Sequence, residues 1–215
     1  MTRATLVYLH GFNSSPRTVK GRKLADAAAA LADPPRVHLP ALHDRPATAM
    51  RDVCVWVDAN VAELASLTFI GSSLGGYYAT WLAEKYGCRA VVINPAVRPA
   101  DTLETYAGPQ RNLHTDETWE LTDQHYVELA ALAVAHPTRM DRYFLLMRSG
   151  DELLDWRDAV RQYAGAWQYV AGGGDHGWED IDDEIPSILR FAGIAMDMSM
   201  LRRGHRISNE QGEHD

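Results

Sequence analysis

One serine in this sequence has the local pattern of a catalytic nucleophile. Ser73 lies in the run Gly71-Ser-Ser-Leu-Gly75, which fills G-x-S-x-G, a pattern in which the serine occupies a strained turn between a strand and a helix. Glycines are needed there because side chains two residues before and after the serine would collide across the turn. Apolar residues precede the pattern and an amphipathic run follows it, so 67–83 predicts strand, turn and helix. Ser72 does not fit, because larger apolar residues flank it.

A carboxylate and a histidine that could activate this serine follow two later strand candidates. Asp151 comes after the apolar run 143–147, and His176 comes after 168–170. Because the carboxyl ends of parallel strands meet at one edge of a sheet, we expect both side chains near Ser73. There the histidine would take the serine proton as a general base, and the aspartate would hold the imidazole in the correct tautomer.

Two further acidic residues compete with Asp151 for that role. Glu152 and Asp155 lie slightly further from the strand end, and an acid at the start of a helix is often only a cap or a partner of the helix dipole. Asp155 is such a candidate cap, for a helix that begins at Trp156. His176 also has an alternative interpretation, as a loop histidine hydrogen-bonded to the backbone.

Backbone N–H groups near the serine would stabilise the oxyanion of an acyl-transfer reaction. The candidates are the N–H of Leu74, at the start of the helix after the serine, and that of Phe12, in the loop after the first strand. His10 is expected to brace that loop. Tyr77 is expected either in the core or against substrate, and Asn94, directly after an apolar strand, is a candidate substrate contact.

Strands that alternate with helices would position these residues. Such alternation predicts an α/β fold with a mainly parallel sheet of about six strands and helices on both faces. The stretch 95–140 is longer than a simple crossover requires and is expected to be a small lid-like insertion, with a hairpin around 112–121. The expected strands are 5–9, 37–39, 67–70, 90–93, 143–147 and 168–170, and the expected helices are 16–32, 47–64, 74–86, 123–135, 154–167 and 181–194.

Length and composition are those of one globular domain. The chain has 215 residues with 46% hydrophobic content, enough for a single core. We expect that domain to cover 1–196, and we expect the polar segment 197–215 to be a disordered tail. Cys54 and Cys88 are too few and too far apart to indicate a disulfide framework.

Charge and motif content exclude several classes of function. The net charge of −8 and the pI near 5.5 lack the basic footprint of a nucleic-acid binder. No apolar run approaches the roughly 18 residues that span a bilayer, and no signal peptide is visible, so a cytoplasmic location is expected. The histidines and acids form no metal-binding motif, and the glycines form no nucleotide-binding motif, so neither a metal nor another cofactor is expected.

At these motifs the sequence resembles the small bacterial esterases typified by YqiA, within the α/β-hydrolase superfamily. The resemblance covers roughly residues 6–193. The blocks that carry it are Leu9-His-Gly-Phe-Asn-Ser-Ser-Pro-Arg17, Gly71-Ser-Ser-Leu-Gly-Gly-Tyr-Tyr-Ala-Thr-Trp-Leu82, Val92-Ile-Asn-Pro-Ala-Val-Arg-Pro99, Gly150-Asp-Glu-Leu-Leu-Asp-Trp156 and the glycine-rich turn at His176. Two features depart from the family: Asp175 stands where an asparagine is expected, and the tail after about Met196 extends beyond the pattern.

The resemblance implies an enzyme that hydrolyses carboxylic esters through Ser73, Asp151 and His176. Its partner would be a small-molecule acyl ester or thioester of short to medium chain length. Two alternatives stay open: an acyl-coenzyme A thioesterase or acyltransferase with the same triad, and a non-catalytic ligand receptor on the same fold. The oligomeric state is not predicted, a homodimer being one option.

Overall fold

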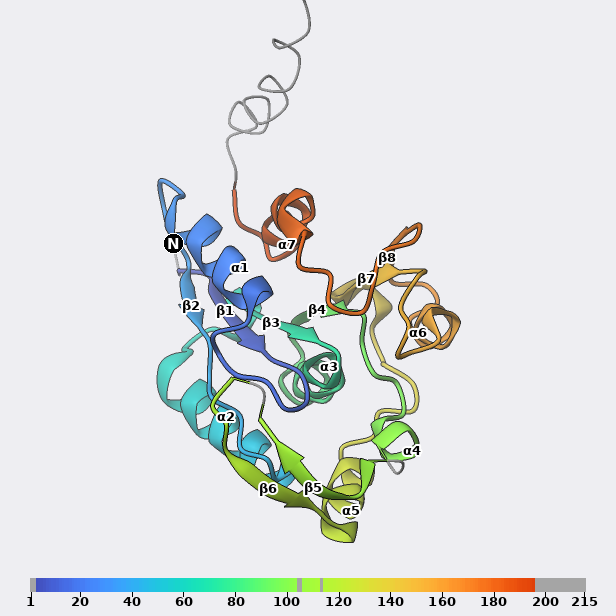
Figure 1. Cartoon of the computed structure of the whole chain (residues 1–215). Helices are drawn as coiled ribbons and strands as arrows, with labels where there is room; N and C mark the ends of the chain where they lie inside the picture. Colours follow the sequence, from blue (N-terminus) through green and yellow to red (C-terminus); the bar gives the residue numbers. More distant parts are fainter. Residues whose placement is uncertain (1–2, 104–105, 113, 196–215) are drawn as a thin grey trace, which may run out of the picture.

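A six-stranded parallel sheet lies at the centre of the molecule (Figure 1). The computed structural model describes residues 3–103, 106–112 and 114–195. Every neighbouring pair of strands in the order β2-β1-β3-β4-β7-β8 is parallel, which is the predicted mainly parallel sheet. The strands are β1 (Thr5–Leu9), β2 (Arg36–His38), β3 (Leu67–Ser72), β4 (Arg89–Ile93), β7 (Tyr143–Arg148) and β8 (Trp167–Ala171).

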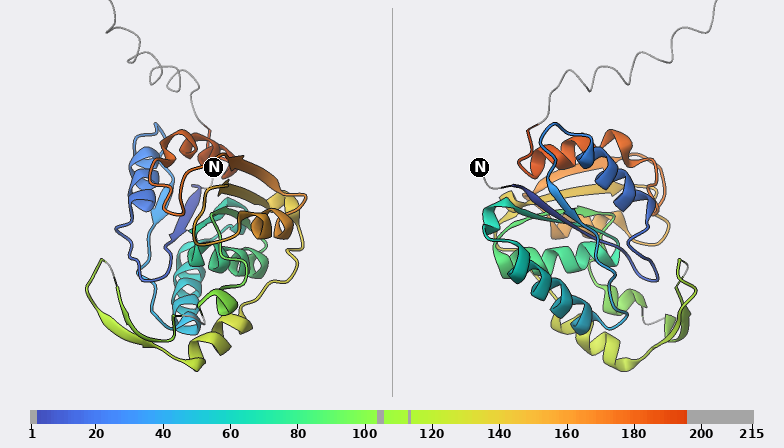
Figure 2. Two further views of the ribbon diagram at one scale, coloured as in Figure 1. Left: turned by 45° about the vertical axis from the view of Figure 1, so that its right-hand side comes forward. Right: turned by 90° about the vertical axis from the view of Figure 1, so that its left-hand side faces the viewer.

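Helices cover both faces of this sheet (Figure 2). Successive side chains of a strand point to opposite faces, and β1 shows the result: Val7 and Leu9 belong to one buried cluster, whereas Leu6 and Tyr8 belong to the other. The central strands are therefore apolar on both faces. The first cluster includes residues of α2 (Pro46–Asn60), α3 (Leu74–Tyr86) and α6 (Trp156–Gln162), and the second includes residues of α1 (Val19–Ala29) and α7 (Ile185–Phe191).

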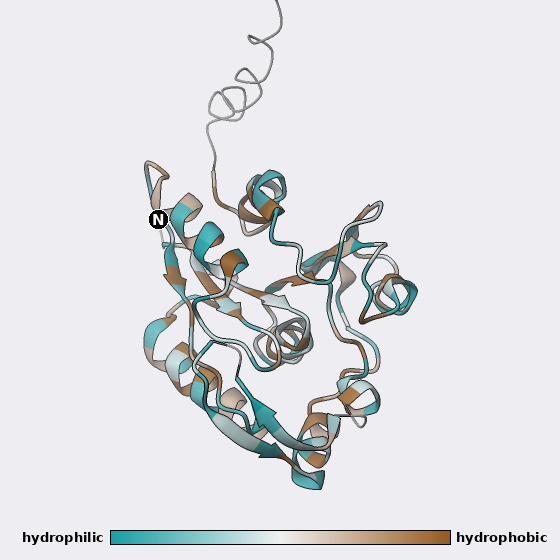
Figure 3. Ribbon diagram, viewed as in Figure 1, coloured by the Kyte–Doolittle hydropathy of each residue, from teal (hydrophilic) through white to brown (hydrophobic). Residues whose placement is uncertain are grey.

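An insertion separates β4 from β7. Its antiparallel hairpin is polar in composition and coloured mainly hydrophilic (Figure 3), and its helix α5 packs beside α2. The elements of the insertion are α4 (Pro99–Leu103), β5 (Gly108–Arg111), β6 (Thr118–Leu121) and α5 (Asp123–Ala131). Short 3-10 helices lie at Leu64–Ser66, Met140–Arg142 and Ile181–Asp183. The predicted disordered tail, 197–215, lies outside the described residues.

Several boundaries differ from the sequence predictions for local reasons. The first helix begins at Val19 rather than Pro16, because the Thr18 hydroxyl accepts the Gly21 N–H (3.2 Å) as the N-cap. Helix α6 begins at Trp156, and Asp155 is its N-cap, which is the capping role considered for this residue in the sequence analysis. The last helix is shorter than expected, because Pro186 cannot lie inside a helix that runs on from 181. The hairpin starts at Gly108 rather than near 112, and α5 and α6 end earlier than predicted, at Ala131 and Gln162.

Candidate active site

Ser73 occupies a strained turn between β3 and α3, as the sequence predicts. Its φ of 56° and ψ of −123° lie outside the regions that non-glycine residues prefer. A Cβ on Gly71 would lie 2.0 Å from the Gly75 carbonyl oxygen, and a Cβ on Gly75 would lie 2.0 Å from the Leu9 carbonyl oxygen. Both positions therefore require glycine. Ser73 is partly exposed, whereas Ser72 is buried.

The turns that follow β7 and β8 are hydrogen-bonded to each other. The Gly150 N–H donates to the Gly173 carbonyl oxygen, and the Gly173 N–H donates to the Ser149 hydroxyl, both at 3.0 Å. A Cβ on Gly150 would lie 2.4 Å from the Gly174 carbonyl oxygen. Neighbouring strands thus bring two turns, distant in sequence, into direct contact.

This contact places a carboxylate against the imidazole of His176. The His176 Nδ1 lies 2.7 Å from the Asp151 Oδ2, and the aspartate side chain is completely buried. The other oxygen, Oδ1, accepts the N–H groups of Leu153 and Leu154, both at 2.9 Å. An ionised carboxylate only accepts hydrogen bonds, so this contact suits a ring with hydrogen on Nδ1; in the neutral form of that ring, Nε2 has a free lone pair. Glu152, one of the rival acids, accepts the backbone N–H of His176 instead (2.9 Å).

A cavity of about 610 Å³ lies beside both the serine and the histidine. Ser73 and His176 both line it, together with Phe12 and Leu74, whose N–H groups are the expected oxyanion donors. Leu74 is the first residue of α3, and the first N–H groups of a helix have no partner within it. Much of the remaining wall is apolar and includes Val19, Leu103, Leu153 and Leu154.

Residues 10–14, which we call the oxyanion loop because they include Phe12, an expected oxyanion donor, lie directly against Ser73. A Cβ on Gly11 would be 3.2 Å from the Ser73 Cβ and 3.7 Å from its Oγ. His10 is buried, which lowers its pKa. Its Nδ1 lies 3.0 Å from the Gly11 carbonyl oxygen, and its Nε2 accepts the Leu42 N–H at 3.2 Å. A neutral ring with hydrogen on Nδ1 satisfies both contacts, so His10 braces the loop.

The two expected substrate contacts lie in the protein interior. Asn94 is fully buried; its Nδ2 donates to the carbonyl oxygens of Asp175 (3.2 Å) and His176 (3.0 Å), and its Oδ1 accepts the Arg148 N–H (2.9 Å). It therefore holds the His176 turn to β7. The Tyr77 hydroxyl donates to the Leu129 carbonyl oxygen of α5 at 2.6 Å, and burial raises its pKa to about 12. Neither residue is in the wall of the Ser73 cavity.

Sequence reasoning missed Lys20, which lines the Ser73 cavity from α1. Its ammonium donates to the carbonyl oxygen of Gly177, the residue after His176. Burial lowers the pKa of Lys20, and the nearby carboxylates of Glu179 and Asp175 oppose that shift. Nothing in the sequence distinguishes this lysine from a solvated one, because its contact joins residues far apart in the chain.

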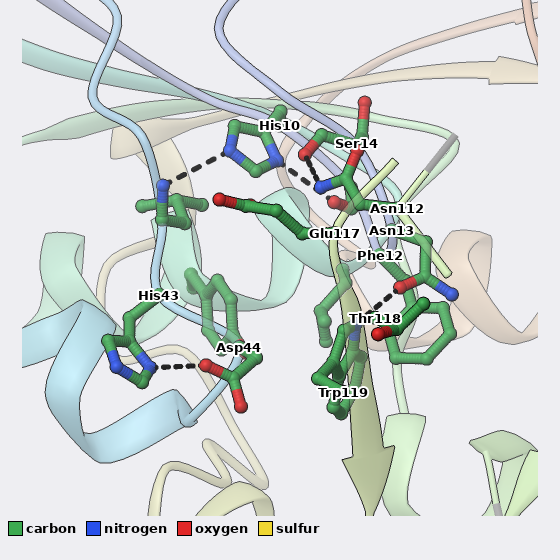
Figure 4. Close-up of a pocket in the computed structure, with 14 residues that line it drawn as sticks. His10, Phe12, Asn13, Ser14, His43, Asp44, Asn112, Glu117, Thr118 and Trp119 are labelled. Atoms are coloured by element: carbon green, nitrogen blue, oxygen red, sulfur yellow. Dashed lines mark hydrogen bonds and ion pairs between the residues drawn. The ribbon is translucent and has the colours of Figure 1, made fainter. Parts of the chain in front are cut away.

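A second cavity, of about 450 Å³, lies beside the oxyanion loop (Figure 4). It shares residues 11–14 and Leu74 with the Ser73 cavity. Its wall also contains Trp119 and Asn112 from the insertion, and His43, whose Nδ1 lies 2.6 Å from the Asp44 Oδ1. Residues of the insertion and of the oxyanion loop therefore line the same cavity.

Within the described residues, no group of three or more His, Cys, Asp or Glu side chains could hold a metal ion. No helix in that part of the chain is long and apolar enough to cross a membrane.

Solved structures with this architecture define the fold. Alpha/beta hydrolase domain-containing protein 10 from mouse is 16% identical with a TM-score of 0.68, over 88% of this chain and 89% of that one. Est1E from Butyrivibrio proteoclasticus is 12% identical with a TM-score of 0.67, over 89% of this chain and 88% of that one. A putative hydrolase from Agrobacterium vitis is 17% identical with a TM-score of 0.66, over 88% of each chain. The chain thus has the α/β-hydrolase fold, with a small antiparallel hairpin in its insertion.

A family model assigns the chain more narrowly. The model of UPF0227, described as an uncharacterised protein family, matches residues 5–193. The chain belongs to this family.

Proposed function

We propose that this protein is a serine carboxylesterase that cleaves short- to medium-chain acyl esters. The observation that carries the proposal is the buried Asp151 hydrogen-bonded at 2.7 Å to His176, which lines the same cavity as the strained Ser73. A nucleophile, a base and a group that orients the base form the arrangement used in covalent acyl transfer. The fold, shared with known esterases, agrees with this chemistry.

The proposed reaction has two halves. The Ser73 Oγ attacks the ester carbonyl carbon while its proton passes to the His176 Nε2, and the N–H groups of Phe12 and Leu74 stabilise the oxyanion. The intermediate then expels the alcohol, which takes the proton from His176, and leaves an acyl-enzyme. Water, deprotonated by the same nitrogen, attacks this acyl-enzyme; the acid is released and Ser73 regains its proton.

Hydrolysis of p-nitrophenyl esters from acetyl to dodecanoyl, with fluorophosphonate labelling mapped by mass spectrometry, tests the proposal. We expect turnover of the shorter chains, label on Ser73, and a loss of at least about 10⁴-fold in kcat for Ser73→Ala. Ser72→Ala is the matched control and should keep the label at position 73. A folded wild-type protein that shows neither turnover nor label would contradict the proposal and favour a non-catalytic receptor.

Two further substrates extend the panel. Est1E has been solved with bound ferulic acid, so a feruloyl ester tests whether this cavity also accepts an aromatic acyl group. Acyl-coenzyme A thioesters test the same triad on a different leaving group. The rank order of kcat/KM across the panel would define the preferred substrate class.

A further inference from the structure

We propose that the β5–β6 hairpin positions the Phe12 N–H of the oxyanion hole. Asn13 is the positioning residue that connects the hairpin to this N–H. The inference rests on the proposed esterase function. It assigns a role in catalysis to a segment that contains none of the triad residues.

Asn13 is well placed to set the orientation of the Phe12 N–H. It directly follows Phe12, and its φ of 50° is one that few non-glycine residues adopt. Asparagine adopts this left-handed conformation more readily than most non-glycine residues, and the side-chain contacts of Asn13 fix its orientation. Because Gly11 already lies against Ser73, a small shift of this loop changes the direction of the N–H relative to the reacting carbonyl oxygen.

The side chain of Asn13 binds both strands of the hairpin. Its Nδ2 donates to the Gln110 Oε1 on β5 at 3.0 Å, and its Oδ1 accepts the Trp119 Nε1–H from β6 at 2.9 Å. Figure 4 shows the second of these contacts at the wall between loop and hairpin. Both polar atoms of the Asn13 side chain are thus hydrogen-bonded to the hairpin. A shift of the hairpin would therefore move the backbone beside Phe12.

Neighbouring contacts support the same connection. The Phe12 and Trp119 rings pack edge to face with centroids 5.5 Å apart, and the Asn112 Nδ2 donates to the Ser14 carbonyl oxygen at 2.8 Å. The start of the oxyanion loop is held by His10, as described above, whereas these contacts hold its end. The hairpin therefore acts as the second of two supports for the loop.

Trp119→Phe and Asn13→Ala test the proposal. The first keeps an aromatic ring at position 119 and removes the N–H donor together with one ring of the indole. The second removes both hydrogen bonds. Arg111→Ala is the matched control, because Arg111 lies on β5 and pairs with Asp116 inside the hairpin (2.8 Å). Circular dichroism and denaturant midpoints establish that each variant is folded.

The readout compares p-nitrophenyl esters with the corresponding thionoesters. Sulfur is a weak hydrogen-bond acceptor, so only the oxygen ester gains fully from a well-placed N–H. We expect Trp119→Phe and Asn13→Ala to lower kcat/KM for oxygen esters about 10- to 100-fold, with a much smaller loss for thionoesters, and Arg111→Ala to change neither value more than about twofold.

Other outcomes would overturn the proposal. Retention of kcat/KM within about twofold in folded Trp119→Phe would show that the hairpin contact does not position the N–H. Equal losses for oxygen esters and thionoesters would show a merely structural role. An inactive wild-type protein would instead count against the esterase function itself, so the two failures are distinguishable.

Discussion

The turns after β7 and β8 and the β5–β6 hairpin both border the Ser73 cavity, but different contacts hold them. The turns continue two neighbouring strands of the main sheet, hydrogen-bond to each other and bury the Asp151 side chain completely. The hairpin is polar and contacts the oxyanion loop through side chains, with Gln110 and Trp119 hydrogen-bonded to Asn13 of the loop. The proposed proton-transfer residues are therefore positioned mainly by backbone contacts, whereas the proposed oxyanion donor Phe12 lies in a loop held partly by side-chain contacts.

The contrast predicts that the largest loss of activity comes from the buried carboxylate. Asp151→Asn should lower kcat roughly 10⁴-fold with little change in folding, because an amide can donate to Nδ1 and favour the wrong imidazole tautomer. Glu152→Gln, which alters only the contact to the His176 backbone, should cost about tenfold or less. Steady-state kinetics on p-nitrophenyl butyrate checks both values. A larger effect of Glu152→Gln would reverse the assignment of the acid.

The second prediction compares the loss of stability when a glycine is replaced by alanine after Ser73 and in the hairpin. A Cβ on Gly75 would overlap the Leu9 carbonyl oxygen at 2.0 Å, whereas one on Gly108 of β5 would meet no atom within 4 Å. Gly75→Ala should therefore cost more than about 4 kcal/mol or prevent folding. Gly108→Ala should cost only about 1–2 kcal/mol, from its φ of 102°. Urea denaturation measures the free energy of unfolding of both variants. Similar losses would show that the turn at Ser73 can relax around a methyl group.

The smallest predicted effect is a pH dependence in the attachment of the insertion. Glu128 of α5 accepts hydrogen bonds from Arg45 and from the Ala47 N–H (3.1 Å) at the start of α2, which lower its pKa from 4.5 to about 2. A depressed carboxyl pKa contributes stability that is complete above 4.5 and is lost as the pH falls toward 2. Glu128→Gln should therefore lower Tm by a few degrees at pH 6, with a difference that disappears near pH 2.

Thermal unfolding of the wild type and of Glu128→Gln, measured from pH 6 to pH 2, tests this prediction. Glu120→Gln, on the exposed face of β6, is the control for removing a negative charge from the insertion. A Tm difference between wild type and Glu128→Gln that stays constant down to pH 2 would mean that ionisation of Glu128 does not stabilise the insertion.

The serine elbow and the sheet could be predicted from sequence because their signals are local. The G-x-S-x-G pattern lies in one continuous stretch of strand, turn and helix, and each central strand is a short apolar run. Gly71 is required by a contact inside this stretch, with Gly75, whereas Gly75 is required by the Leu9 carbonyl oxygen of β1. Chain order then placed Asp151 and His176 after neighbouring strands. These patterns were sufficient for the fold and for Ser73 and His176 as candidates, and they favoured Asp151 without excluding its acidic neighbours.

Contacts between distant segments were decided only by the tertiary structure. The choice between two adjacent acids depends on how the turn after β7 meets the turn after β8, and so does the use of Asn94 as a buried support rather than a substrate contact. Asn13 meets Gln110 and Trp119 across about a hundred residues of chain. Such hydrogen bonds leave no periodic signal, because their geometry is set by packing of the whole insertion against the sheet.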